Sequence, residues 1–189
     1  IKLYMNKRPT YWVLPDVLSK KEILLINKVS KKNGINEPEQ NGARVKGEKL
    51  KHTTSKLIKY TNLKKYLSNI IESCCIINRE QYGFDVHPIN EYDCILTNTY
   101  NINDRYDWHT DIANDCRFED LKLTVLINIS TKTYKGGDLE IFHHVINKVD
   151  NFKPGTLIMF PSIYNHRVTP ITEGERTSLT MFIKGPLFR

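Results

Sequence analysis

The spacing of apolar residues near the start of the chain predicts one amphipathic helix. Ser19 and Glu22 have the three-residue spacing of a capping box, so the helix is predicted to begin there. Asn33-Gly34 is a typical stop. The apolar positions predict one buried face, made of Ile23, Leu24, Ile26 and Val29. Before this helix, residues 11–14 are typical of a short strand.

A second helix is predicted over about residues 62–80, where apolar side chains recur three or four residues apart. They are Leu63, Leu67, Ile70, Cys74 and Ile77. This stripe predicts packing against a sheet, with one of the adjoining Cys74 and Cys75 buried and the other incidental. Between the helices, residues 34–55 are polar and predict a long loop with a short strand near 43–45. Loops of this kind often serve as mobile lids.

After Gly83 the pattern changes to short β-rich runs separated by polar turns. Strands are predicted at 94–100, 121–130, 139–143, 156–160 and 176–184. Because strand follows strand with no helix between them, the pattern excludes a parallel βαβ sheet and favours an antiparallel sandwich or jelly roll. The predicted fold is α+β, mainly β, with the N-terminal helices packed on the outside.

The length of 189 residues suits one domain, and the composition is that of an ordinary globular protein. We therefore predict a single domain over residues 1–189, with a helical part of about 1–83 and a jelly-roll core of about 84–189. No run of about 18 apolar residues predicts a membrane span. The four cysteines lack CxxC spacing, so reduced thiols and a cytoplasmic location are expected.

The net charge of +7 is distributed unevenly along the chain. Residues 1–70 carry 16 Lys/Arg and 5 Asp/Glu, a net of +11, whereas residues 71–189 carry 12 and 16, a net of −4. Such asymmetry can indicate a surface for nucleic acid or an acidic partner. Because no aromatic interleaving or recognition motif accompanies the lysines, a solvated lysine-rich face is the favoured interpretation.

Three residues in the β-rich part have the character of metal ligands. His109 and Asp111 are two apart, so in a strand they project from the same face. His166, 57 residues downstream of His109, is the candidate for a third ligand. Two histidines and one carboxylate form the facial triad of non-haem iron(II) oxygenases, which leaves positions open for a cosubstrate and dioxygen.

Arg176 lies ten residues after His166, and Ser178 follows two residues later on the same predicted strand face. A planar guanidinium beside a hydroxyl suits a carboxylate, because the guanidinium fork binds both oxygens at a fixed geometry. The site is therefore predicted to take an anionic oxo-acid next to the metal.

The ordered set of motifs resembles the iron(II)- and 2-oxoglutarate-dependent dioxygenases, and within them the prolyl 4-hydroxylase branch, especially bacterial and viral PKHD-type hydroxylases. The motifs cover about residues 95–185 and are Tyr100-x-x-Asn103-x-x-Tyr106-x-x-His109-x-Asp111, Gly136-Gly137-Asp138-Leu139-Glu140-Ile141-Phe142, the segment 153–161, and His166-Arg167-Val168-Thr169-Pro170-Ile171 running on to Arg176. The resemblance implies a double-stranded β-helix, a cupin-like jelly roll.

The resemblance also implies roles for individual residues. Tyr100 corresponds to a tyrosine that often hydrogen-bonds 2-oxoglutarate, and Leu139 to an apolar wall beside it. Tyr106 and Trp108 correspond to the substrate side of the iron. Many relatives carry a tyrosine at the position of Leu126 and a tryptophan at that of Phe182. This departure leaves Ser178 or Thr124 as the candidate second anchor for the distal carboxylate.

The resemblance implies that 2-oxoglutarate is decarboxylated to succinate and carbon dioxide while a substrate carbon is hydroxylated, with dioxygen as cosubstrate and ascorbate as reductant. The implied substrate is a prolyl residue of a peptide or protein. A nucleic-acid oxidative demethylase of the same fold is the main alternative, supported by the basic N-terminal part. A non-catalytic jelly-roll binding protein is the alternative outside enzymology, although the intact triad argues against it.

Overall fold

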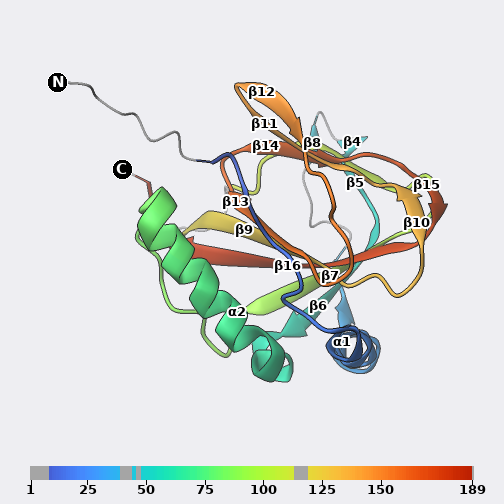
Figure 1. Cartoon of the computed structure of the whole chain (residues 1–189), viewed down its shortest axis with the longest axis horizontal. Helices are drawn as coiled ribbons and strands as arrows, with labels where there is room; N and C mark the ends of the chain where they lie inside the picture. Colours follow the sequence, from blue (N-terminus) through green and yellow to red (C-terminus); the bar gives the residue numbers. More distant parts are fainter. Residues whose placement is uncertain (1–8, 39–43, 46–47, 113–118, 189) are drawn as a thin grey trace.

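The computed structural model describes residues 9–38, 44–45, 48–112 and 119–188. Two antiparallel sheets face each other, and two helices cover the outer side of the larger sheet (Figure 1). The larger sheet has seven strands in the order β1-β13-β9-β16-β7-β6-β2, and the smaller has five in the order β12-β11-β14-β8-β5. This jelly-roll arrangement confirms the fold class predicted from the sequence.

Each strand is short, as a jelly roll requires. The seven-stranded sheet contains β1 Trp12–Leu14, β2 Ile35–Asn36, β6 Thr54–Lys59, β7 Cys94–Tyr100, β9 Asp120–Asn128, β13 Leu157–Pro161 and β16 Arg176–Gly185. The five-stranded sheet contains β5 Lys51–His52, β8 Arg105–His109, β11 Leu139–His143, β12 Val145–Lys148 and β14 Asn165–Val168. Two further pairs are β3 Arg44–Val45 with β4 Glu48–Lys49, and β10 Tyr134–Gly136 with β15 Ile171–Gly174.

Helix α1, Lys20–Asn33, begins as the capping box predicts. The Glu22 backbone N–H donates to the Ser19 hydroxyl at 3.3 Å, and the Ser19 N–H donates to the Glu22 carboxylate at 2.8 Å. Ile23 and Ile26 are buried against the sheet, but Leu24 is 60% exposed. The prediction for Leu24 is wrong because one residue turns the helix by about 100°, which carries Leu24 away from the face that Ile23 and Ile26 bury.

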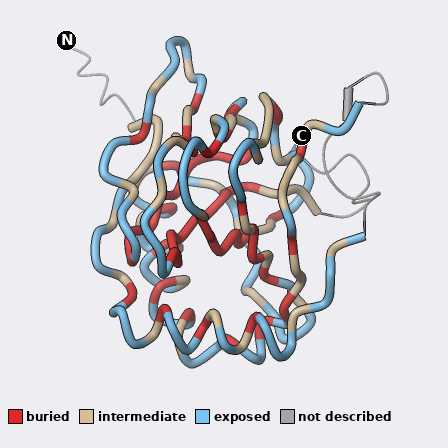
Figure 2. The backbone as a smooth tube through the Cα atoms, turned by 90° about the vertical axis from the view of Figure 1, so that its right-hand side faces the viewer, coloured by how far each residue is buried: buried red, intermediate tan, exposed pale blue. Residues whose placement is uncertain are grey.

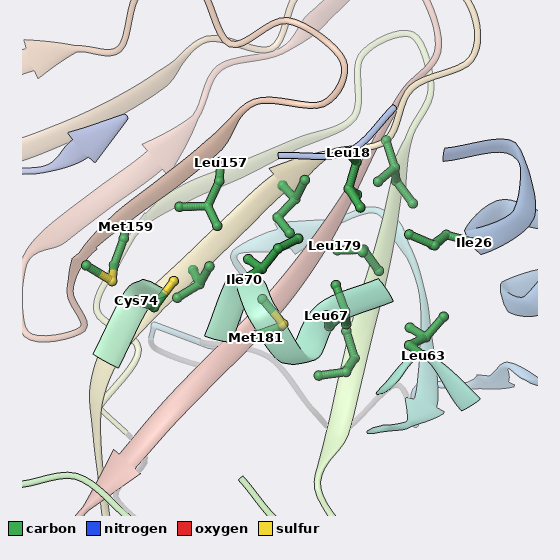
Figure 3. Packing of buried hydrophobic residues seen from close by; sticks show 14 of the residues in the cluster. Leu18, Ile26, Leu63, Leu67, Ile70, Cys74, Leu157, Met159, Leu179 and Met181 are labelled. Atoms are coloured by element: carbon green, nitrogen blue, oxygen red, sulfur yellow. The ribbon is translucent and has the colours of Figure 1, made fainter. Parts of the chain in front are cut away.

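Helix α2, Lys64–Ile77, is shorter than the predicted segment. A 3₁₀ turn, η1 Tyr60–Asn62, precedes it, and a π-helical turn, η2 Asn78–Tyr82, follows. The predicted stripe faces the sheet: Figure 3 shows side chains of α2 pointing at Leu179, Met181, Leu157 and Met159 of the strands. Cys74 is buried and Cys75 is half-buried, as expected for one packed and one incidental thiol. Cys116 lies outside the described residues.

The apolar residues form two layers, one on each side of the seven-stranded sheet. The first lies between this sheet and the helices, and the second lies between the two sheets and includes Leu126, Leu139, Ile158 and Phe160. Figure 2 shows the buried backbone running through the middle of the molecule, with exposed segments around it. No helix in the described part of the chain has the length and apolar character needed to cross a bilayer.

The prediction of one long loop over residues 34–55 is wrong for the residues that the structure describes. β2, β5 and the start of β6 fall within it, and β6 pairs with β7 over its whole length. The strand is hard to recognise from the sequence because β6 buries a serine, Ser55, as well as Ile58. The short strand predicted near 43–45 appears as Arg44–Val45, and residues 39–43 and 46–47 lie outside the described part.

Strands β7 and β11 have the predicted bounds, and β9, β13 and β16 begin or end within two residues of them. The turn between β10 and β11 contains Gly136 and Gly137, with φ of 73° and 66°. Positive φ is accessible to glycine at little cost, so this pair allows the chain to reverse tightly. After this turn, β11 pairs with β14 in the five-stranded sheet.

Candidate active site

The three predicted metal ligands come together between the two sheets. In the pairing of β8 with β14, His109 lies directly opposite His166. Asp111 was expected in the same strand as His109, but it lies two residues beyond the end of β8. Its backbone N–H donates to the Ser162 carbonyl at 3.0 Å. One ligand atom from each of the three side chains lies within 4.8 Å of the others, a spacing able to hold one metal ion.

Both histidines present the same ring nitrogen to this centre. The Nδ1 atom of His109 lies 2.8 Å from the Asp107 carbonyl, and that of His166 lies 3.0 Å from the Tyr164 carbonyl. Because a carbonyl oxygen only accepts, each Nδ1 carries the proton and each Nε2 keeps its lone pair. The Nε2 atoms lie 3.5 Å and 3.3 Å from the carboxylate oxygens of Asp111. In metal sites, hydrogen bonds from the other ring nitrogen to a carbonyl, like those of Nδ1 here, fix the orientation of the imidazole.

The protonation states also suit a cation. Burial acts to raise the pKa of Asp111, but the electrostatic influence of His166 and His109 and the hydrogen bond from Thr124 lower it to about 2. Burial lowers the pKa of His166, against the attraction of Asp111. At neutral pH the site therefore offers an ionised carboxylate and a neutral His166, the forms that coordinate metals.

The structure places Thr124 in contact with this centre. Its hydroxyl donates to Oδ2 of Asp111 at 2.7 Å and lies 2.9 Å from the Ser162 hydroxyl. Thr124 stands on β9, so it holds the carboxylate from the sheet opposite β8 and β14. Sequence reasoning placed Thr124 differently and missed Ser162, because no motif marks which side chains meet across the two sheets.

Arg176 is the largest fully buried side chain outside the metal centre, with 1% of its surface exposed. It stands on β16 opposite Tyr100 of β7, and its guanidinium carbon lies 5.2 Å from the ring centres of both Tyr100 and Phe152. Two of its nitrogens, Nε and Nη1, are buried without a hydrogen-bond partner among the described residues. A buried cation with unused donors favours an anion as its partner, and a guanidinium is well suited to a carboxylate.

Tyr100, Leu139 and Ser178, the other residues predicted around the cosubstrate, are also buried. Burial raises the pKa of Tyr100 to about 12, although Arg176 acts to lower it, so the phenol remains a hydrogen-bond donor. Leu139 is 1% exposed and belongs to the same apolar layer, and the buried Ser178 lies two residues along β16 from Arg176. Phe152 was not identified from the sequence, because it lies in a segment between strands without a motif of its own.

Comparison with known proteins agrees with this arrangement. Residues 95–184 match the 2OG-Fe(II) oxygenase superfamily, and the matched region contains all three predicted metal ligands and Arg176. Residues 95–184 therefore belong to this superfamily. Membership implies iron(II) and 2-oxoglutarate, and the resemblance inferred from the sequence motifs is confirmed.

Curated relatives of this oxygenase include PKHD-type hydroxylases of Escherichia coli and Shewanella oneidensis. They are each 32% identical to the chain, over 95 and 94 residues. The aligned region is 47% of this chain and 42% of either relative, so the match spans less than half the length of the curated proteins.

Solved structures share the fold of this oxygenase over almost its whole length. A Pseudomonas putida prolyl-4-hydroxylase is similar with a TM-score of 0.69 and 19% identity, covering 94% of each chain. A viral collagen prolyl hydroxylase from Paramecium bursaria Chlorella virus-1 gives 0.68 and 17%, covering 94% of this chain and 97% of the other. A Trichoplax adhaerens prolyl hydroxylase, crystallised with a peptide of hypoxia inducible factor, gives 0.67 and 18%, covering 94% and 84%.

The residues of this oxygenase fit the groups that its family implies. The donor set of two imidazoles and one carboxylate is that of non-haem iron(II) sites. The unpaired donors of Arg176 provide a separate observation for the dicarboxylate 2-oxoglutarate, because a buried guanidinium without an anion is strongly unfavourable.

The two aromatic residues predicted on the substrate side lie in different places. The Tyr106 ring stacks on the His109 ring, with centroids 3.4 Å apart, so it borders the metal centre. Trp108 instead lies against Arg167, whose guanidinium is 4.8 Å from the Trp108 ring and is paired with Glu140 at 2.7 Å. Because side chains alternate along β14, Arg167 points away from the face of His166. The structure therefore brings Tyr106, but not Trp108, to the candidate site.

Proposed function

We propose that this oxygenase hydroxylates a prolyl residue of a peptide or protein and converts 2-oxoglutarate to succinate and carbon dioxide. The cosubstrate part of this proposal rests on two observations taken together: the buried guanidinium of Arg176 with two unused donors, and the cluster of His109, Asp111 and His166. An isolated metal site or an isolated arginine would fit many proteins, whereas the two together in one jelly roll favour this chemistry.

In this proposal His109, Asp111 and His166 hold iron(II), and Arg176 holds the distal carboxylate of 2-oxoglutarate. When bound, iron(II) with 2-oxoglutarate and dioxygen supplies the oxidising power that inserts an oxygen atom into a C–H bond, and ascorbate serves as reductant. The protein's own part is placement. Tyr100, Leu139 and Ser178 shape the pocket around Arg176, and preorganised partners of this kind account for much of enzymatic rate enhancement.

Second contacts keep the ligands in their working forms. The Thr124 hydroxyl donates to Asp111, which leaves the carboxylate ionised and fixed in direction. The carbonyls of Asp107 and Tyr164 hold the two imidazoles as Nδ1–H tautomers. Because these contacts come from three separate segments of the chain, they preorganise the centre for metal binding.

The prolyl substrate is supported by the names of the relatives and by one feature of the chain. Several structural neighbours are prolyl hydroxylases, one of them in complex with a peptide. The Tyr106 ring borders His109, and a flat aromatic face packs well against a pyrrolidine ring.

A nucleic-acid oxidative demethylase is the second candidate, because residues 1–70 carry a net charge of +11. Binding to a phosphate backbone releases counterions, so affinity would fall by roughly a factor of ten per tenfold rise in salt for each neutralised phosphate. The two candidates therefore differ in a measurable way, and a non-catalytic jelly roll would give no turnover at all.

The decisive experiment measures succinate release with iron(II), 2-oxoglutarate and ascorbate, in the presence of proline-containing peptides or a methylated oligonucleotide, across a salt series. We expect stimulation by prolyl peptides, a mass gain of one oxygen on the peptide, and little dependence on salt. The Asp111→Ala variant serves as the inactive control, since it removes a ligand without altering either sheet. Salt-sensitive stimulation by the oligonucleotide alone would support the demethylase instead.

A further inference from the structure

A second polar cavity of about 480 Å³ lies between helix α1 and the outer face of the seven-stranded sheet. Its lining contains four lysines, five threonines and one serine, but only one carboxylate, that of Glu175. The residues come from α1, from the strands β6, β7 and β16, and from the segment after β9. Figure 1 shows α1 beside β6, away from the space between the two sheets. The cavity is therefore separate from the candidate active site.

Three of the four lysines of this cavity have no ion-pair partner among the described residues. Lys132 lies 3.5 Å from the Glu175 carboxylate, and Lys31 stands in the last turn of α1, where the helix dipole favours a cation. Lys28 and Lys56 have no ion-pair partner among the described residues. Lys28 and Lys31 are also three residues apart on one helix, an arrangement in which like charges repel.

Hydroxyl groups of α1, β7 and β16 also line this cavity. Ser30 of α1 and Thr97 of β7 are buried and lie 2.8 Å apart through their hydroxyl oxygens, which ties the helix to the sheet. Thr99 and Thr177 face each other across β7 and β16 and also line the cavity. The cavity thus combines hydroxyl donors of the helix and the sheet with lysines of α1, β6 and the segment after β9.

We propose that this cavity binds a small phosphate-bearing anion. The lining has no arginine, so the planar fork that suits carboxylates is absent from it. Lysines act as point charges that surround a tetrahedral phosphate from several directions, and threonine hydroxyls donate to its oxygens. The recess between helix and sheet suits a small anion better than an extended nucleic-acid backbone, which would follow an open basic surface.

The position of the site relative to Arg176 makes it testable on its own. Thr177 and Thr99 are the strand neighbours of Arg176 and Tyr100, and successive residues of a strand point to opposite faces. The anion therefore lies behind the sheet that carries the candidate cosubstrate pocket. Saturation with 2-oxoglutarate should leave its binding stoichiometry unchanged, and so should Arg176→Lys.

The test is calorimetric titration of the metal-free full chain with pyrophosphate at low ionic strength. The variant Lys28→Gln/Lys56→Gln removes two unpaired charges but keeps most of each side-chain stem, which matters because the Lys56 stem packs near Gly34. The matched control, Lys59→Gln/Lys64→Gln, removes the same net charge from exposed positions outside the cavity. We expect one pyrophosphate per chain, binding about tenfold weaker in the first variant and within about twofold of the unmodified chain in the control.

Three outcomes would overturn the proposal. The first is the absence of pyrophosphate binding by the unmodified chain at millimolar concentration. The second is equal weakening in both variants, which would indicate a general effect of net charge. The third is tighter binding of a single-stranded oligonucleotide that depends on Lys59 and Lys64 as well, which would indicate an extended polyanion surface.

Discussion

The Tyr106 ring lies flat against the His109 ring, with centroids 3.4 Å apart and planes 8° from parallel. His109 is thus held on two sides: its Nδ1–H donates to the Asp107 carbonyl, and its face rests on an aromatic ring from the same strand. A bulge in the pairing of β8 with β14 makes this contact geometrically accessible, because it brings Tyr106 opposite Val168 while His109 stays opposite His166. Tyr106 therefore orients a candidate metal ligand.

Replacing Tyr106 with alanine should weaken metal binding, because the imidazole would lose the surface that fixes its tilt. Loss of such a supporting group typically costs about 10- to 100-fold in metal affinity. Tyr106→Phe keeps the ring and should stay within about threefold of the unmodified protein. Titration of the metal-free protein with manganese(II) or cobalt(II) gives the affinities. Trp108→Ala is the control, since Trp108 packs on Arg167, and unchanged affinity in Tyr106→Ala would contradict the orienting role.

A second prediction concerns the hydroxyl that holds Asp111. Thr124→Val keeps the shape of the side chain but removes the 2.7 Å hydrogen bond to the carboxylate and the 2.9 Å contact with Ser162. Metal affinity should fall by about tenfold, with a cost in stability of about 1–3 kcal/mol from the polar groups left without partners. Thr124→Ser retains the hydroxyl and should restore most of the affinity. Equal 2-oxoglutarate affinity in Thr124→Val and the unmodified protein would separate this role from cosubstrate binding.

The order of ligand types along the chain predicted which residues would meet, although it did not predict how. His109 and His166 lie on paired strands, as a shared metal requires, and Arg176 lies on the strand predicted for it. The position of Asp111 outside β8 could not be inferred, because the end of the strand depends on the contact of its backbone with Ser162. A two-residue spacing fixes a common face only while the strand continues.

The tertiary contacts between strands and loops could not be predicted from the sequence. Thr124 meets Asp111, and Phe152 meets Arg176, only after β9 and β16 have taken their register in the seven-stranded sheet. Likewise, the burial of Ser55 of β6 is tolerated because its hydroxyl donates to the side chain of Asn98 of β7 at 2.6 Å. A polar residue that is buried with a polar partner gives no hydrophobic period, so β6 was not recognised as a strand.

The capping box of α1 predicts a pH-dependent contribution to stability. The hydrogen bonds with Ser19 lower the pKa of Glu22 below its usual value. A carboxyl whose folded-state pKa is lowered contributes stability above its unfolded-state pKa, and this contribution is lost as the pH falls through the folded-state value. Ser19→Ala should therefore cost about 1 kcal/mol at pH 7, and less at pH 3. Urea unfolding at the two pH values measures the difference. A cost that does not change with pH would show that Glu22 takes no part in the cap.

The last prediction concerns Arg176, whose buried guanidinium has two donors without partners among the described residues. Removing one member of a buried hydrogen-bonded charge pair typically costs about 2–5 kcal/mol, so Arg176→Ala should bind 2-oxoglutarate about 30-fold to a few thousand-fold more weakly. Arg176→Lys should rescue only part of this loss, because an ammonium keeps the charge but lacks the planar fork.

The measurement is calorimetric titration with 2-oxoglutarate in the presence of manganese(II), with metal affinity determined separately for each variant. Arg176→Ala should keep the metal affinity of the unmodified protein, since His109, Asp111 and His166 are untouched, and this separates loss of the anion pocket from loss of the fold. Substituting glutamine for Lys132 provides a control that removes one positive charge outside the space between the sheets. Unchanged 2-oxoglutarate binding in Arg176→Ala with an intact metal site would mean that another cation holds the distal carboxylate.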